Sequence, residues 1–233
     1  MNRKKLAIIA VIAVVIIVTG VYVSGILGGG LGAQNKTLTV LAGAGFVKVT
    51  NDMKTEFEKE HPGVTVNVQN GGSGELFSIL ETQKSADIFM PADYKYMGDA
   101  MKNGDMENDT IKNITKNIPV IVVAKGNPKN IQSLADLGNS GVKVAIGEPN
   151  GPAIGKTTSN ILNKTGLNDS VQANVVVKTT TVNQLLTYIV TGQADTTIIW
   201  EDMTSWPEAQ GRIDIIKIPA NQTIISTVPI GVT

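Results

Sequence analysis

From residue 37 onward the hydrophobic positions alternate between a strand-like and a helix-like spacing. Residues 37–41 are a short β-prone run, and a glycine-containing turn, 42–45, follows it. The next segment carries apolar residues at the three- to four-residue spacing of a helix face: Phe46, Val49, Met53 and Phe57. Pro62-Gly63 ends this helix, and residues 64–68 then alternate as a strand.

The same unit is repeated once more. A second glycine turn at 70–74 opens a helix with Leu76, Ile79 and Leu80 on one face, and residues 86–90 form the next strand. Strands that alternate with helices through short loops predict a mainly parallel α/β sheet flanked by helices.

A β-branched run at 118–124 breaks this rhythm, and a second set of units follows. We expect its strands at 142–146, 173–177 and 197–200, its helices after a turn at 147–155 and over 182–191, and a last β run at 224–232. The pattern predicts two α/β lobes: residues 35–117 form lobe I, residues 118–223 form an inserted lobe II, and residues 224–233 return to lobe I. Runs 118–124 and 224–232 would be the hinge pair.

The first 34 residues have a different character. Three basic residues at 3–5 precede an apolar run of 18 residues, 6–23, and a glycine-rich stretch at 24–32 follows. A basic start, a long apolar run and a small-residue exit are typical of an export signal, and the run is also close to the length of a membrane span. We therefore expect a signal peptide or an N-terminal membrane anchor, with the rest of the chain extracytoplasmic, either anchored at the cell surface or secreted.

The composition argues against two classes of function, nucleic-acid binding and catalysis. The 233-residue chain has 20 basic and 20 acidic residues, so it lacks the basic surplus typical of nucleic-acid binding. It has no cysteine and one histidine, His61, which lies beside a helix-ending Pro-Gly turn. Because there is no HExxH motif, no cysteine pair and no Gly-X-Ser-X-Gly elbow, an enzyme is not expected. No metal site or cofactor is expected either.

The candidate site is a set of glycine-rich turns that each precede a helix, at 42–46, 71–75 and 147–155. Such turns present unpaired backbone N–H groups at a helix N-terminus, where the helix dipole also favours an anion. Although glycine turns are common in α/β folds, three of them together with a two-lobe pattern favour a ligand cleft between the lobes. The first two turns contain no Lys or Arg. Neutral donors suit a fully ionised anion that is bound and not transformed.

The sequence of residues 86–97, ADIFMPADYKYM, resembles the ADxFxSAD…M segment of the periplasmic molybdate-binding proteins of ABC importers. Further segments fall in the order and spacing of that family: 39–44 (TVLAGA), 72–76 (GSGEL), 142–149 (VKVAIGEP) and 191–195 (TGQAD). The resemblance covers residues 37–233. It implies a two-lobed clamshell of the class II periplasmic-binding-protein type that binds molybdate or tungstate.

The resemblance also implies site residues. Oxyanion donors fall on Gly45, Gly72 or Ser73, Ala153 or Ile154, Val182 and Trp200. Gly45 replaces the usual serine and Trp200 replaces the usual tyrosine. In archaeal tungstate-binding relatives a glutamate at the position of Glu201 coordinates the metal together with an aspartate. Because the turn at 147–155 offers only Glu148 in this role, we expect tetrahedral coordination with Glu201 solvated at the cleft rim.

The implied partners are the small oxyanion and the permease of an ABC transporter; we expect a monomer. Family members continue beyond the return strand into one or two helices of lobe I, and this sequence stops at Thr233. Two alternatives stay open: a binding protein for sulfate, phosphate or another small anion, and a surface-anchored sensor or adhesion module without a transport role.

Overall fold

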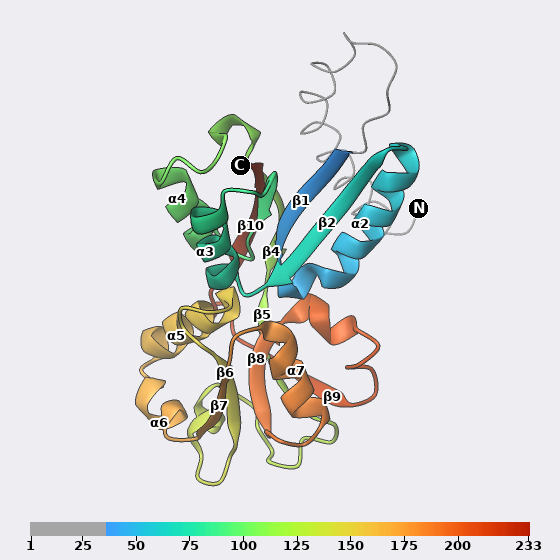
Figure 1. Ribbon diagram of the computed structural model, residues 1–233. Helices are drawn as coiled ribbons and strands as arrows, with labels where there is room; N and C mark the ends of the chain where they lie inside the picture. Colours follow the sequence, from blue (N-terminus) through green and yellow to red (C-terminus); the bar gives the residue numbers. More distant parts are fainter. Residues whose placement is uncertain (1–35) are drawn as a thin grey trace, which may run out of the picture.

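The computed structural model describes residues 36–233, which form two sheets of five strands, each flanked by helices (Figure 1). We call the first sheet with its helices lobe I and the second lobe II. The expected export signal or anchor lies outside the described residues. Within them, no helix is both long and apolar enough to cross a bilayer.

Lobe I has the strand order β2-β1-β3-β10-β4. Its strands are β1 (Lys36–Gly43), β2 (Val64–Gly71), β3 (Ile88–Met90), β4 (Lys112–Asn117) and β10 (Ser226–Val232). Its helices are α2 (Val47–Glu60), α3 (Ser73–Gln83) and α4 (Tyr94–Lys102), with short 3₁₀ helices η1 (Ala44–Phe46) and η2 (Asn108–Thr110).

Lobe II repeats this arrangement with the order β7-β6-β8-β5-β9. Its strands are β5 (Pro119–Ala124), β6 (Val144–Gly147), β7 (Val175–Thr179), β8 (Thr196–Trp200) and β9 (Ile213–Lys217). Its helices are α5 (Ala153–Thr165), α6 (Asn168–Gln172) and α7 (Val182–Val190), with η3 (Ala135–Gly138) and η4 (Glu201–Ser205).

In each sheet the fourth strand in this order arrives from the other lobe and runs against its neighbours. Strand β5 pairs antiparallel with β8 and β9, and β10 pairs antiparallel with β3 and β4. Pro119, at the start of β5, lies opposite Trp200, at the carboxyl end of β8. The entering chain therefore starts at the edge where the other strands end, and it must run in the opposite direction.

The two β runs that we expected to be hinge strands do not cross between the lobes. Strand β5 lies within the sheet of lobe II and β10 within the sheet of lobe I. The chain crosses at Ile118, between β4 and β5, and again in residues 218–225, between β9 and β10. The crossings are thus the short segments that precede the two strands.

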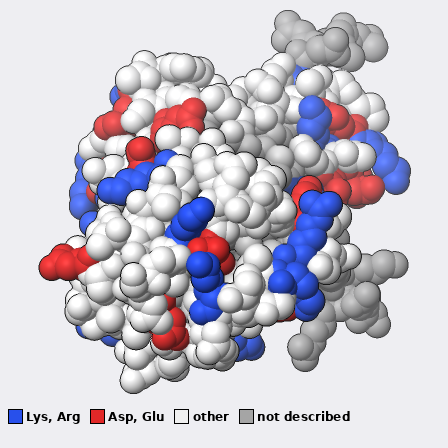
Figure 2. All heavy atoms as spheres, turned by 90° about the horizontal axis from the view of Figure 1, so that it is seen from below, with Lys and Arg blue, Asp and Glu red and all other residues white. Residues whose placement is uncertain are grey.

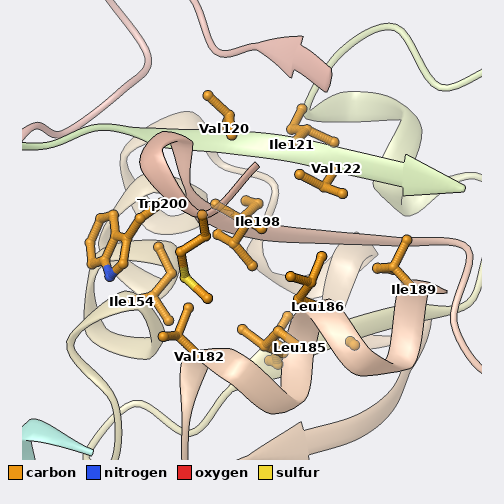
Figure 3. Packing of buried hydrophobic residues seen from close by; sticks show 14 of the residues in the cluster. Val120, Ile121, Val122, Ile154, Val182, Leu185, Leu186, Ile189, Ile198 and Trp200 are labelled. Carbon is orange, nitrogen blue, oxygen red and sulfur yellow. The ribbon is translucent and has the colours of Figure 1, made fainter. Parts of the chain in front are cut away.

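The core of lobe II brings the sheet and helix α7 together (Figure 3). Leu185, Leu186 and Ile189 of α7 are buried in the same cluster as Val120, Ile121 and Val122 of β5 and Ile198 of β8. Their spacing on α7 is that of one helix face. This packing fixes Val182, at the start of α7, beside Trp200, at the end of β8 (Figure 3).

The predicted α/β class with two sheets is confirmed. The strands and helices expected from glycine turns and apolar spacing are present within a few residues. Four elements were not predicted: α4, β4, α6 and β9.

Candidate oxyanion-binding site

A small cavity lies where the two lobes meet, with an empty volume of about 230 Å³. Its lining from lobe I is Gly43, Ala44, Gly45, Gly71, Gly72, Ser73 and Ala92, and its lining from lobe II is Pro152, Ala153, Ile154, Val182 and Trp200. Its small size suits a small ion better than an organic metabolite.

All seven residues that the sequence placed at an oxyanion site line this cavity: Gly45, Gly72, Ser73, Ala153, Ile154, Val182 and Trp200. They come from segments that are well separated in the chain. The fold therefore brings them together, as expected for turns at the carboxyl ends of strands in facing sheets.

The cavity lies at the beginnings of several helices. Ser73 is the first residue of α3, Ala153 the first of α5 and Val182 the first of α7, while Gly45 lies in η1, directly before α2. Helices α3 and α5 have no side-chain cap, and Gly72 and Pro152 stand at their cap positions. Donors at these ends are thus not occupied by a capping side chain.

The lining residues whose backbone N–H groups donate to no acceptor among residues 36–233 include Gly45, Ser73, Ala153, Ile154 and Val182. Two N–H groups close to them do have acceptors. The Gly74 N–H donates to the Gly151 carbonyl, and the Gly155 N–H to the Pro152 carbonyl. The unused donors belong to both lobes and line one small space, and helix N-termini of this kind attract anions.

The Ser73 hydroxyl is oriented by a hydrogen bond that it accepts. The Ala92 N–H donates to Ser73 Oγ at 3.1 Å, and Ser73 is almost fully buried, with 1% of its surface exposed. A hydroxyl oxygen that accepts still has its own proton to donate. The Ala92 carbonyl accepts from Asn117 Nδ2 at 2.9 Å, so both backbone polar groups of Ala92 are hydrogen-bonded.

Gly45 and Trp200, the two positions that depart from the family pattern, are neighbours. A Cβ atom on Gly45 would lie 3.6 Å from Trp200 Cδ1 and 3.5 Å from Val182 Cγ1, which is ordinary van der Waals contact. Trp200 has 2% of its surface exposed, and its indole nitrogen points away from Ile198 and the α7 leucines (Figure 3). None of the hydrogen bonds within residues 36–233 involves this N–H, so it is a further donor at the cavity.

No lining residue of this cavity carries a charge. The face of the molecule seen in Figure 2 carries basic and acidic residues that are interspersed, without a field of one sign. The site therefore depends on directed dipoles and not on a general positive potential.

The two glutamates considered as metal ligands lie outside the lining. Glu201 is partly exposed, and its carboxylate lies 3.6 Å from Lys217 Nζ, while its N–H donates to the Ile118 carbonyl at 2.8 Å. Glu148 is exposed. No group of three or more His, Cys, Asp or Glu residues in the described part of the chain could hold a metal ion.

A second cavity, in lobe I, differs in character. It lies between α2 and the sheet, has an empty volume of about 430 Å³, and is lined mainly by aliphatic and aromatic side chains that include Leu38, Val40, Phe57 and Val68. A surface of this kind lacks the directed donors that an oxyanion needs.

Sequence reasoning did not name five of the lining residues as donors: Gly43, Ala44, Gly71, Ala92 and Pro152. All of them except Ala92 lie within the three turns that it placed at the cleft. Ala92 follows β3 in the segment that resembles the molybdate-binding family, and its position at a strand end was the signal that could have identified it.

Comparison with known proteins agrees with this geometry. Residues 38–233 match the family described as bacterial extracellular solute-binding protein. The molybdate-binding protein ModA of Mycobacterium tuberculosis (strain ATCC 25618 / H37Rv) is 32% identical over 193 residues, which cover 78% of this chain and 72% of the relative.

Two solved structures share the fold. The periplasmic molybdate-binding protein of Azotobacter vinelandii superposes with a TM-score of 0.72 at 18% identity, over 84% of this chain and 85% of that one. The sulfate-binding protein SubI from Mycobacterium tuberculosis H37Rv gives a TM-score of 0.68 at 21% identity, over 84% of this chain and 75% of that one. The expected periplasmic-binding-protein fold is confirmed.

Proposed function

This chain belongs to the family of bacterial extracellular solute-binding proteins, and from that premise we propose that it captures molybdate or tungstate outside the cytoplasm for an ABC importer. The permease of that importer is the protein partner. We propose further that residues 1–34 export the chain or anchor it to the membrane, and that it acts as a monomer without a cofactor and without catalysis.

The observation that supports this proposal is the uncharged cavity with donors from both lobes. Ser73 offers a backbone N–H and a hydroxyl, Ala153, Ile154 and Val182 offer backbone N–H groups, and Trp200 offers an indole N–H. Six such hydrogen bonds to a charged ligand, at about 1.5–3 kcal/mol each, give roughly 10–20 kcal/mol gross. Lobe closure, ligand desolvation and lost freedom remove part of this, which leaves binding in the sub-micromolar to nanomolar range.

The donor set also favours particular anions. Molybdate, tungstate and sulfate are fully ionised at neutral pH and differ in size, so fixed donors select among them by distance. Phosphate at this pH carries a proton that needs an acceptor. Because the cavity offers mainly donors, we expect it to discriminate against phosphate.

We propose tetrahedral coordination by these donors, with the Glu201 carboxylate outside the first coordination sphere. Its ion pair with Lys217 supports this proposal, because that contact gives the carboxylate a partner other than the anion. Glu148, which is exposed, is likewise expected to make no bond to the metal.

Calorimetric titration of the anion-free protein tests the function. We expect molybdate or tungstate to bind at least about tenfold more tightly than sulfate or phosphate, a difference of about 1.4 kcal/mol. Comparable binding of sulfate would identify a general sulfate-type binding protein. Absence of binding to all four anions would favour the sensor or adhesion role.

A further inference from the structure

The two lobes touch along a line beside the cavity, where the N-terminus of α3 in lobe I meets the turn before α5 in lobe II. The Gly74 N–H donates to the Gly151 carbonyl at 3.0 Å, and the Tyr96 hydroxyl donates to the Asn150 carbonyl at 3.2 Å. We call these four residues the closure contact. Neither Gly74 nor Tyr96 lines the cavity.

Gly74 has no room for a side chain in this arrangement. A Cβ atom built there would lie 2.3 Å from the Asn150 oxygen and 3.2 Å from the Gly151 oxygen. Both are backbone atoms of lobe II, which cannot rotate away as a side-chain end can. Gly74 lies within α3 and has no positive φ angle, so helix geometry itself does not require glycine here. The close approach of the other lobe does, together with the Tyr96 hydroxyl oxygen, which would lie 3.1 Å from the same Cβ atom.

Tyr96 supports the contact from the core of lobe I. It has 3% of its surface exposed and packs with Leu76, Phe89 and Met97, so its ring position is fixed by lobe I alone. Burial, followed by the nearby Asp93 and Asp99 carboxylates, raises the pKa of the Tyr96 phenol. The hydroxyl therefore keeps the proton that it donates to lobe II well into alkaline solution.

The turn that these residues hold leads directly into the binding site. Asn150 and Gly151 precede Pro152, Ala153 and Ile154, which line the cavity. On the lobe I side, Gly74 follows Ser73, which also lines it. The closure contact thus joins the two donor loops one or two residues away from the groups that face the anion, and it sets the distance between them.

We propose that Gly74 and Tyr96 are positioning residues for anion binding, which bring the α5 donors of lobe II to their working distance from Ser73. This inference rests on the proposed function. In the free protein with its lobes apart, neither residue would affect the spacing of the donors, although Tyr96 would still pack in the core of lobe I. In the closed protein both are needed, although neither touches the ligand.

The first test is Gly74→Ala, with Gly98→Ala as the matched control. Gly98 also lies within a lobe I helix, α4, and a Cβ atom there would meet nothing within 4 Å. Alanine favours a helix over glycine, so both variants should melt at the same or a higher temperature than wild type without ligand. We expect Gly74→Ala to weaken molybdate and tungstate binding by at least about tenfold, and Gly98→Ala to leave it unchanged.

The second test is Tyr96→Phe, which keeps the ring in the core and removes only the hydroxyl. We expect the dissociation constant to rise about three- to tenfold, the loss of one hydrogen bond between neutral groups, mainly through faster dissociation. Small-angle scattering with saturating molybdate should show a more open Gly74→Ala protein than wild type. A merely structural role would change melting temperatures and would not change this closure.

Wild-type affinity in Gly74→Ala would overturn the positioning role and leave the proposed function intact. An equal loss of affinity in Gly98→Ala would overturn it as well, because the effect would then belong to helix glycines in general. A wild-type protein that binds neither anion would overturn both proposals at once.

Discussion

The Ser73 side chain connects the binding cavity to the internal structure of lobe I. Its oxygen accepts from the Ala92 N–H, and the carbonyl of Ala92 accepts from Asn117, the last residue of β4 before the chain crosses to lobe II. One serine therefore holds a cavity-lining loop and also presents a donor to the anion. These two roles can be separated experimentally, since only one of them requires the ligand.

We expect Ser73→Ala to weaken molybdate or tungstate binding by about 1–3 kcal/mol, the cost of losing one hydrogen bond to a charged group. The ligand-free protein should also lose about 1 kcal/mol of unfolding free energy, because the buried Ala92 N–H loses its acceptor. Calorimetry and thermal melting measure the two effects. An unchanged dissociation constant would mean that backbone N–H groups alone bind the anion on this side.

Glu201→Gln is the control for that measurement and also tests the coordination geometry. Glu201 pairs with Lys217 and does not line the cavity. The Glu201→Gln variant should therefore bind molybdate and tungstate with the affinity of wild type. A tenfold loss of tungstate binding would instead show that the carboxylate reaches the metal.

At the residue scale, sequence reasoning found the cavity because its donors sit in glycine turns at strand ends and in segments that resemble a known family. It could not find the hydrogen bond between Asn117 and Ala92, which joins residues 25 positions apart. It also missed the role of Gly74, since nothing local distinguishes a glycine excluded by a neighbouring lobe from one that only loosens a helix. The hydrogen bond depends on how segments of lobe I pack, and the exclusion at Gly74 depends on how the two lobes meet.

At the element scale, the four elements missed from the sequence have common physical causes. Strand β4 (KNITKN) is almost entirely polar and lies at a sheet edge, where the backbone groups on one side of the strand have no partner strand. Strand β9 lies at an edge of the lobe II sheet, and α6 has only five residues. Helix α4 buries Tyr96, Met97 and Ala100, but its start was marked only by Asp93, which accepts from the Lys95 N–H.

Asp93 supplies a prediction about helix α4. Burial raises the pKa of its carboxyl, more than its hydrogen bonds from the Tyr96 and Lys95 N–H groups lower it. The charged form is therefore disfavoured in the folded protein at neutral pH. Asparagine caps helices about as well as aspartate, so Asp93→Asn should raise the melting temperature at pH 7. Because a folded-state carboxyl with a raised pKa takes up its proton before the unfolded one, this advantage should disappear as the pH falls to the ordinary carboxyl range.

Asp99, on the same helix, is the matched control, because the pKa of its carboxyl is shifted in the opposite direction. Its hydrogen bond with Lys95, at 3.0 Å, lowers the pKa of the Asp99 carboxyl. That contact stabilises the fold above the ordinary carboxyl pKa and is lost as the pH falls through the lowered value. Asp99→Asn should therefore lower the melting temperature slightly at pH 7. If both variants shift stability in the same direction, burial is not what controls Asp93.

At the scale of the whole molecule, two sets of polar contacts between side chains or backbone groups of residues 36–233 join the lobes. Beside the cavity is the uncharged closure contact of Gly74 and Tyr96. At the surface, Lys48 of α2 pairs with Glu208 of lobe II at 2.9 Å and lies 4.8 Å from the ring centroid of Trp206. Both would form as the lobes come together. The contact that contributes more to the affinity for the anion is the one that controls closure.

The exposed pair should contribute little. The Lys48 and Glu208 side chains keep 41% and 56% of their surface exposed, and ion pairs in such positions are screened by water and salt. We expect Lys48→Gln to raise the dissociation constant for molybdate at most about fivefold at low salt. Relative to wild type measured in the same buffer, that ratio should approach one at about 0.5 M salt, where screening acts over a few ångströms. Glu208→Gln should give the same ratio, and the double variant no further loss, if the two residues act as a pair.

The steric block in Gly74→Ala has no such salt dependence, because it arises from overlapping atoms. A larger or salt-independent effect of Lys48→Gln would therefore assign control of closure to the surface contact with Trp206 and Glu208.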